Sequence, residues 1–108
     1  MSYRILLSDN FKREAKRLAK KYPSFKKDLA ALGKQLSEMP TMGISLGNNV
    51  YKVRISISSK RKGKSGGARA ISYVDVEKET VLLLSIYDKS EKVNISNKEI
   101  RELLKKYV

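Results

Sequence analysis

The chain has 108 residues, 41% of them hydrophobic, which is typical of one folded domain and excludes a disordered chain. It has no cysteine and no histidine, so disulfides and the usual zinc sites are excluded, and no apolar run is long enough for a transmembrane helix or a signal peptide. Lys and Arg number 24 against 11 Asp and Glu, and residues 40–74 contain seven basic residues and no acidic one. We therefore expect a cytoplasmic protein, a single domain over residues 1–108, whose basic surface attracts an anionic partner such as nucleic acid, an anionic membrane or an acidic protein.

The first part of the chain predicts a strand and two helices. Residues 2–8 are typical of a short strand. Apolar residues then recur at helical spacing over residues 11–22, with lysines and arginines on the opposite face. Pro23 ends this helix, and a second helix is predicted from Ser24 to a point before Pro40. The short junction predicts an antiparallel helical hairpin.

The second part predicts a loop and three strands. The glycines, asparagines and proline of residues 40–49 are typical of a loop. Alternation with a period of two begins at Tyr51, a second strand covers residues 69–74, and residues 81–87 are nearly all apolar, as expected of a strand inside a sheet. Because short polar loops join these three strands, we expect an antiparallel meander.

The last predicted element is a helix. Ser96 and Glu99 have the spacing of a capping box, and Ile100, Leu103 and Tyr107 mark one face of the helix that follows. The predicted fold is therefore α+β, a small single domain in the order β-α-α-β-β-β-α, with the helical hairpin packed on a mostly antiparallel sheet.

A basic, glycine-rich segment runs from Lys60 to Arg69. It holds five cationic side chains and three glycines and no acid, between two predicted strands. Glycine lets a backbone bend sharply and approach a partner closely, and the cations attract phosphate. We therefore predict that this segment and the adjoining strand faces form an RNA-handling surface. Gly63-Lys64-Ser65 resembles the end of a P-loop, but position 58 is serine and a strand follows, so we reject that motif.

The chemistry left to such a surface relies on Lys, Arg, Tyr and backbone amides. The 2′-hydroxyl of RNA can attack the adjacent phosphate, so the protein needs to stabilise the developing charge and assist proton transfer, and a Lys or Tyr of lowered pKa is a candidate base. Lys52 and Arg54 share one strand face, Arg69 begins the next strand, and Tyr87 and Lys89 end the third on a common side. If that face is exposed, the five groups converge. The alternative is that Arg54 and Tyr87 only border the core.

A metal site is not expected. Three carboxylates, those of Asp75, Glu77 and Glu79, are close in sequence, but they fall in a predicted hairpin turn beside Lys78 and are most simply solvated. We expect no cofactor.

The order of elements and three segments resemble the toxins of the RelE/ParE superfamily, and most closely its HigB-like (RelE/StbE-type) branch. These segments are Gly47-x-x-Val50-Tyr51-Lys52-Val53-Arg54, Gly63-Lys64-Ser65-Gly66-Gly67-Ala68-Arg69 and Leu84-Ser85-Ile86-Tyr87-Asp88-Lys89-Ser90-Glu91. The resemblance implies the RelE-like fold and the toxin of a bacterial type II toxin–antitoxin system. It further implies a ribosome-dependent mRNA endonuclease that inhibits translation by cutting mRNA in the ribosomal A site without a metal. The implied partners are mRNA, the ribosome and a cognate acidic antitoxin, with no membrane and no small-molecule substrate.

The resemblance also implies roles for individual residues. Arg69 matches the strand arginine placed at the phosphate, Arg54 matches the basic position of the preceding strand, and Lys62 and Lys64 match the basic segment. The tyrosine that RelE-type toxins carry after the last strand falls here at Ser96 or a neighbour, so the sequence does not identify the base. The expected catalytic residues are Arg54, Lys64, Arg69, Tyr87 and Lys89. The expected RNA-binding residues are Lys52, Lys60, Arg61, Lys62, Lys64 and Arg69.

Two other functions stay open at this point. One is a ParE-like toxin that inhibits DNA gyrase by binding it, and the other is a nonspecific nucleic-acid-binding module. The clustered cations and the Gly-Gly-x-Arg segment favour RNA cleavage, because gyrase inhibition does not require clustered phosphate ligands.

Overall fold

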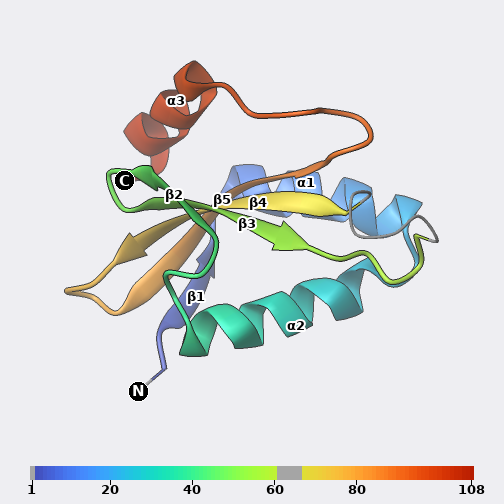
Figure 1. Ribbon diagram of the computed structural model, residues 1–108, viewed down its shortest axis with the longest axis horizontal. Helices are drawn as coiled ribbons and strands as arrows, with labels where there is room; N and C mark the ends of the chain where they lie inside the picture. Colours follow the sequence, from blue (N-terminus) through green and yellow to red (C-terminus); the bar gives the residue numbers. More distant parts are fainter. Residues whose placement is uncertain (1, 61–66) are drawn as a thin grey trace.

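A computed structural model describes residues 2–60 and 67–108 of the chain (Figure 1). Five strands and three helices are described in this part of the chain, and they follow one another in the order β1 (Arg4–Leu7), α1 (Asp9–Lys21), α2 (Phe25–Glu38), β2 (Ile44–Gly47), β3 (Val50–Ile55), β4 (Ala68–Asp75), β5 (Thr80–Asp88) and α3 (Asn97–Tyr107). The predicted α+β class is confirmed. No helix in the described ranges is long and apolar enough to cross a membrane.

The strands form one sheet in the order β1-β5-β4-β3-β2. β3, β4 and β5 pair antiparallel, as the predicted meander requires, and β1 pairs parallel with β5. The nearly all-apolar strand β5 lies inside the sheet between β1 and β4. The prediction of a mostly antiparallel sheet is therefore confirmed.

One strand was not predicted. Residues 44–47, which the sequence placed in a loop, form the edge strand β2, so the prediction of three strands after the helical hairpin was wrong. Asn48 and Asn49 have φ angles of 53° and 65°, and together they make the two-residue turn of a β2–β3 hairpin. Every residue of β2 is exposed, so no alternation of buried and exposed side chains marks it as a strand.

The two faces of the sheet carry separate apolar clusters. The first cluster joins α1 and α2 to one face through side chains such as Phe11, Leu18, Leu36 and Val53. The second joins α3 to the other face through residues that include Ile71 and Ile100. Accordingly, α2 and α3 lie on opposite sides of the sheet in Figure 1. The predicted helical hairpin and its packing on the sheet are confirmed.

Side-chain caps begin two of the helices. The Ser8 hydroxyl accepts a hydrogen bond from the Phe11 amide at the start of α1. At α3, the Ser96 hydroxyl accepts from the Glu99 amide while the Glu99 carboxylate accepts from the Ser96 amide, which is the predicted capping box.

Helix α1 also covers the edge of β5 beyond the end of β1. The carbonyl of Leu84 accepts hydrogen bonds from Ser8 Oγ at 3.1 Å and Asn10 Nδ2 at 3.0 Å, and the amide of Ile86 donates to Glu14 Oε1 at 3.2 Å. These side chains replace the strand partner that β1 is too short to supply. The end of β5, which carries Tyr87, is thereby held in place.

Candidate functional site

Three of the predicted site residues form one row across the sheet. Arg54 on β3 lies directly opposite Arg69 on β4, and Arg69 lies directly opposite Tyr87 on β5. Their neighbours Val53 and Ala70 pack against the helical hairpin, so the row faces the other way. The structure brings these three residues together, and we call them the Arg–Arg–Tyr row. Tyr87 also belongs to the second apolar cluster, so the alternative that it borders the core holds for this residue.

Arg69 is the buried member of the row. Arg69 is 7% exposed, whereas Arg54 lies at the surface. The guanidinium of Arg69 donates a hydrogen bond to the carbonyl of Ala68 at 3.0 Å. Burial lowers the pKa of Arg69, and repulsion from Arg54 lowers it further. Arginine side chains are not deprotonated in proteins, so the row presents two positive charges to an anion.

A cavity of about 250 Å³ opens over the two arginines. Its lining consists of Gly43, Ile44, Lys52, Arg54 and Arg69. Lys52 therefore belongs to the same surface, because it lies two residues before Arg54 on the same face of β3. A cavity lined by three cations, with no acid among its lining residues, suits a phosphate group.

Tyr87 is held as a neutral phenol. It is 5% exposed, and burial raises its pKa, while the charges of Arg69 and Lys92 oppose this rise without cancelling it. Lys92 Nζ lies 5.7 Å from the centre of the ring. The expectation of a lowered pKa is therefore wrong for Tyr87, because burial outweighs the nearby cations. A neutral phenol is suited to donate a proton or a hydrogen bond.

Asn94 belongs to this surface, and the sequence did not indicate it. Its Oδ1 lies 3.3 Å from Lys52 Nζ and 3.5 Å from Tyr87 Oη, so it stands between β3 and β5 on the side of the row. Ser96, where the family resemblance led us to look for the missing tyrosine, instead caps α3. Asn94, two residues before Ser96, makes the polar contacts to Lys52 and Tyr87. In the sequence, only the place of Asn94 in the segment after the last strand could have suggested this role.

The sequence also did not indicate that Asp88 is the centre of a hydrogen-bonded network. Its side chain is fully buried, and the carboxylate accepts from Lys60 Nζ at 2.7 Å, Lys21 Nζ at 3.5 Å, the hydroxyl of Tyr22, and the amide and hydroxyl of Ser90 at 2.9 and 2.7 Å. Burial alone would raise the pKa of Asp88. The hydrogen bonds from Lys60, Tyr22 and Ser90 outweigh burial and hold that pKa well below its usual range.

The remaining predicted residues divide into two groups. Lys60 and Lys89 are described: the ammonium of Lys60 binds Asp88 and Ser90, and the amide of Lys89 donates to the carbonyl of Gly67 at 3.2 Å. Their predicted roles toward RNA stay predictions. The others, Arg61, Lys62 and Lys64, lie outside the described residues.

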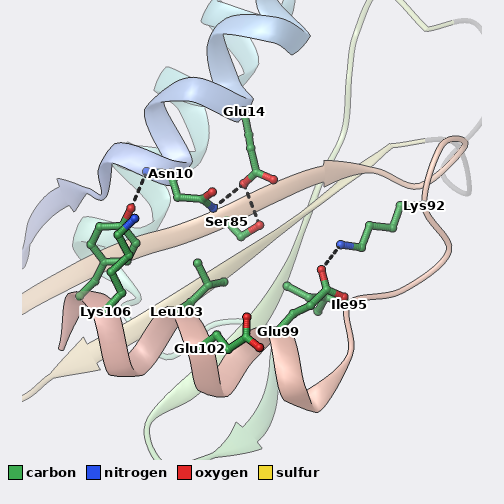
Figure 2. A pocket seen from close by; sticks show the side chains of 10 residues that line it. Asn10, Glu14, Ser85, Lys92, Ile95, Glu99, Glu102, Leu103 and Lys106 are labelled. Carbon is green, nitrogen blue, oxygen red and sulfur yellow. Dashed lines mark hydrogen bonds and ion pairs between the residues drawn. The ribbon is translucent and has the colours of Figure 1, made fainter.

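A second cavity lies between α1 and α3 and also measures about 250 Å³ (Figure 2). Figure 2 shows Glu14 bound to Ser85 and Asn10 on one side, and Lys92 paired with Glu99 on the other. These polar groups satisfy one another. Within residues 2–60 and 67–108 no three carboxylates gather where they could hold a metal ion.

Comparison with known proteins agrees with this architecture. Residues 3–107 match the family model described as the RelE toxin of the RelE/RelB toxin–antitoxin system. The fold is similar to that of a mutant of the Escherichia coli toxin RelE in the free state, with a TM-score of 0.66, 17% identity and full coverage of both chains. It is also similar to a chain of the toxin–antitoxin complex RelBE2 from Mycobacterium tuberculosis, with a TM-score of 0.54, 18% identity and coverage of 82% of this chain and 99% of that one. At these identities the solved structures show the fold, and the family model shows the family.

Proposed function

The chain belongs to the RelE toxin family, the toxins of toxin–antitoxin systems, and from this premise we propose that it cleaves messenger RNA in the ribosomal A site without a metal. The single observation that carries the proposal is the Arg–Arg–Tyr row. Two guanidiniums and a neutral phenol lie on adjacent strands beside a cavity lined by cations. Catalysis of phosphoryl chemistry by electrostatic stabilisation requires such fixed cations at the phosphate.

The proposed reaction uses the nucleophile that RNA itself carries. The 2′-oxygen attacks the adjacent phosphorus and the bond to the 5′-oxygen breaks, which leaves a cyclic phosphate and a 5′-hydroxyl. Arg69 and Arg54 stabilise the negative charge that builds on the phosphate oxygens, and the Tyr87 phenol donates a proton to the departing 5′-oxygen. Lys64 and Lys89 are the candidates for the base that takes the 2′-hydroxyl proton.

We also propose a cognate antitoxin as the partner that silences this surface. The relative from Mycobacterium tuberculosis was solved as a toxin–antitoxin complex, and this chain carries a formal net charge of +13. An acidic segment that orders on contact would neutralise the exposed cations around the row and cover the cavity. The toxin would act in the cytoplasm, where translating ribosomes are found.

Induced expression in a bacterial host tests the proposal. Primer extension on an abundant mRNA should show new cuts inside codons, and the cuts should disappear when the start codon of that message is removed. Growth arrest with intact mRNA would contradict the proposal and point to a protein target such as gyrase. Cuts that persist in an untranslated message would contradict ribosome dependence.

A further inference from the structure

Lys60 is engaged inside the protein. Its ammonium lies 2.7 Å from Asp88 Oδ1 and 3.3 Å from Ser90 Oγ, and 5.3 Å from the centre of the Tyr22 ring. The side chain of Lys60 is 13% exposed. A phosphate would have to displace the Asp88 carboxylate to reach this charge, and breaking a buried ion pair is strongly unfavourable. Among the described cations predicted to bind RNA, Lys60 is thus the one whose charge is paired with a buried carboxylate.

Asp88, whose carboxylate binds Lys60, directly follows Tyr87 of the Arg–Arg–Tyr row in the sequence. Tyr87 faces the Arg–Arg–Tyr row, the next residue, Asp88, binds Lys60, and the amide of Lys89 donates to the carbonyl of Gly67 at 3.2 Å. Lys60 is the last described residue before positions 61–66, and Gly67 is the first after them. Both described flanks of the basic segment are therefore fixed to two consecutive residues at the end of β5.

Further contacts leave these flanks little freedom. Asp28 on α2 accepts from the amide and hydroxyl of Ser58 at 2.9 and 2.5 Å, and Ser59 donates its amide to Ser24 Oγ at 2.8 Å. On the other flank, a Cβ at Gly67 would lie 2.4 Å from the carbonyl oxygen of Ile55. Helix α2 thus holds the outgoing flank, and close backbone packing holds the returning one.

We propose that Lys60 is a positioning residue, which Asp88 holds in order to fix the flanks of the basic segment beside the Arg–Arg–Tyr row, and not a ligand of RNA phosphate. The inference rests on the proposed RNA-cleaving function and assigns this cation a different task within it. Its effect on the reaction passes through Asp88 to the adjoining Tyr87 of the row, so it should appear in kcat and not in RNA affinity.

The test compares Lys60→Met with a matched variant, Lys52→Met, which removes one lysine from the cavity wall itself. Binding of a single-stranded RNA oligonucleotide is measured by fluorescence anisotropy across a range of salt concentrations. Each phosphate contact contributes about 0.7 to the slope of log K against log salt for single strands. We expect Lys52→Met to lower the slope by about that amount and Lys60→Met to leave it unchanged. On programmed ribosomes, Lys60→Met should lower kcat about tenfold or more with KM unchanged. A slope that falls equally in both variants would overturn the proposal.

A thermal-unfolding cycle examines the anchor without RNA. Lys60→Met, Asp88→Asn and the double variant are compared with the wild type. We expect the double variant, in which neither charge of the pair remains, to lose much less Tm than the sum of the two single losses. Additive losses would overturn the anchor. A wild-type protein that neither binds nor cuts RNA would instead refute the proposed function, and this cycle would still decide whether Asp88 anchors Lys60.

Discussion

Arg54 and Arg69 lie directly opposite each other in the antiparallel β3–β4 pair, two like charges on one face of the sheet. Like charges in this position destabilise a sheet by about 0.2–1 kcal/mol. In the described part of the chain neither guanidinium forms a salt bridge with a carboxylate. The lowered pKa of Arg69, caused by burial and then by Arg54, reflects the same unfavourable placement. An arrangement that costs stability is expected where a bound anion uses it.

Replacing Arg69 with methionine should therefore separate activity from stability. We expect Arg69→Met to lower mRNA cleavage about 10²- to 10³-fold, because a charge at the reacting phosphate is lost. Its Tm should equal or exceed that of the wild type, because the like-charge pair and the buried charge are both removed. Circular dichroism and primer extension on the same preparation measure the two effects. A large fall in Tm would show that Arg69 is structural.

Glycine positions offer a matched pair of substitutions. Gly33 lies within α2 with no atom within 4 Å of an added Cβ, so Gly33→Ala should stabilise the protein by about 1 kcal/mol. Gly67→Ala should destabilise it, because the added Cβ would meet the backbone carbonyl of Ile55 at 2.4 Å. Urea unfolding of both variants measures the difference in the free energy of unfolding. Equal effects would mean that Gly67 does not lie close against the carbonyl of Ile55.

The buried carboxylate of Asp88 should give an acid-dependent stability. Its folded pKa lies below the unfolded value of about 3.9, so its contribution is complete above that pH and is lost as the pH falls through the folded pKa. We expect Asp88→Asn to cost about 3 kcal/mol at pH 7, and the gap between variant and wild type to narrow below about pH 4.

Glu91 provides the control for this prediction. Hydrogen bonds from Arg17 and then Lys21 lower its pKa to about 2, but the pair lies at the surface, where solvent screens it. Glu91→Gln should cost on the order of 1 kcal/mol or less. Urea unfolding from pH 3 to pH 7 compares the two variants, and an Asp88→Asn loss as small as that of Glu91→Gln would contradict the buried-anchor account.

Tyr87 should lose its phenolic proton at a higher pH than an exposed tyrosine does. Because burial raises its pKa above the ordinary value of about 10, its phenolate should form at higher pH than those of exposed tyrosines. The difference between wild type and Tyr87→Phe in absorbance at 295 nm isolates this one group. A Tyr87 phenolate that appears below pH 10 would restore the tyrosine as a candidate base.

The sequence predicted the helices, the strands of the meander and the face on which the row lies because each depends on local periodicity. Lys52, Arg54 and their buried neighbours alternate with a clean period of two, which fixes the face on which they lie. The strand β2 was not predicted because none of its side chains is buried, so no alternation of buried and exposed residues marks it. Asn94 and the partners of Asp88 could not be predicted either, because they join residues as far apart as Tyr22 and Asp88, and only the folded chain brings these together.

The sign of the Tyr87 shift shows a similar limit. Net charge alone suggested that dense positive charge lowers the pKa of a nearby phenol. Burial at the second apolar cluster has the larger effect, and the degree of burial depends on how α3 packs over β5. Charge can be counted from sequence, whereas desolvation requires the packing of elements that are distant in sequence.

Cleavage of mRNA on programmed ribosomes tests the central claim most directly. Purified toxin is mixed with an mRNA that is either free or bound to ribosomes with an empty A site, and the products are mapped at nucleotide resolution. The account predicts cuts within the A-site codon only in the ribosome-bound message, and their loss in Arg69→Ala. Intact ribosome-bound mRNA with folded wild-type protein, or equal cutting by Arg69→Ala, would contradict it.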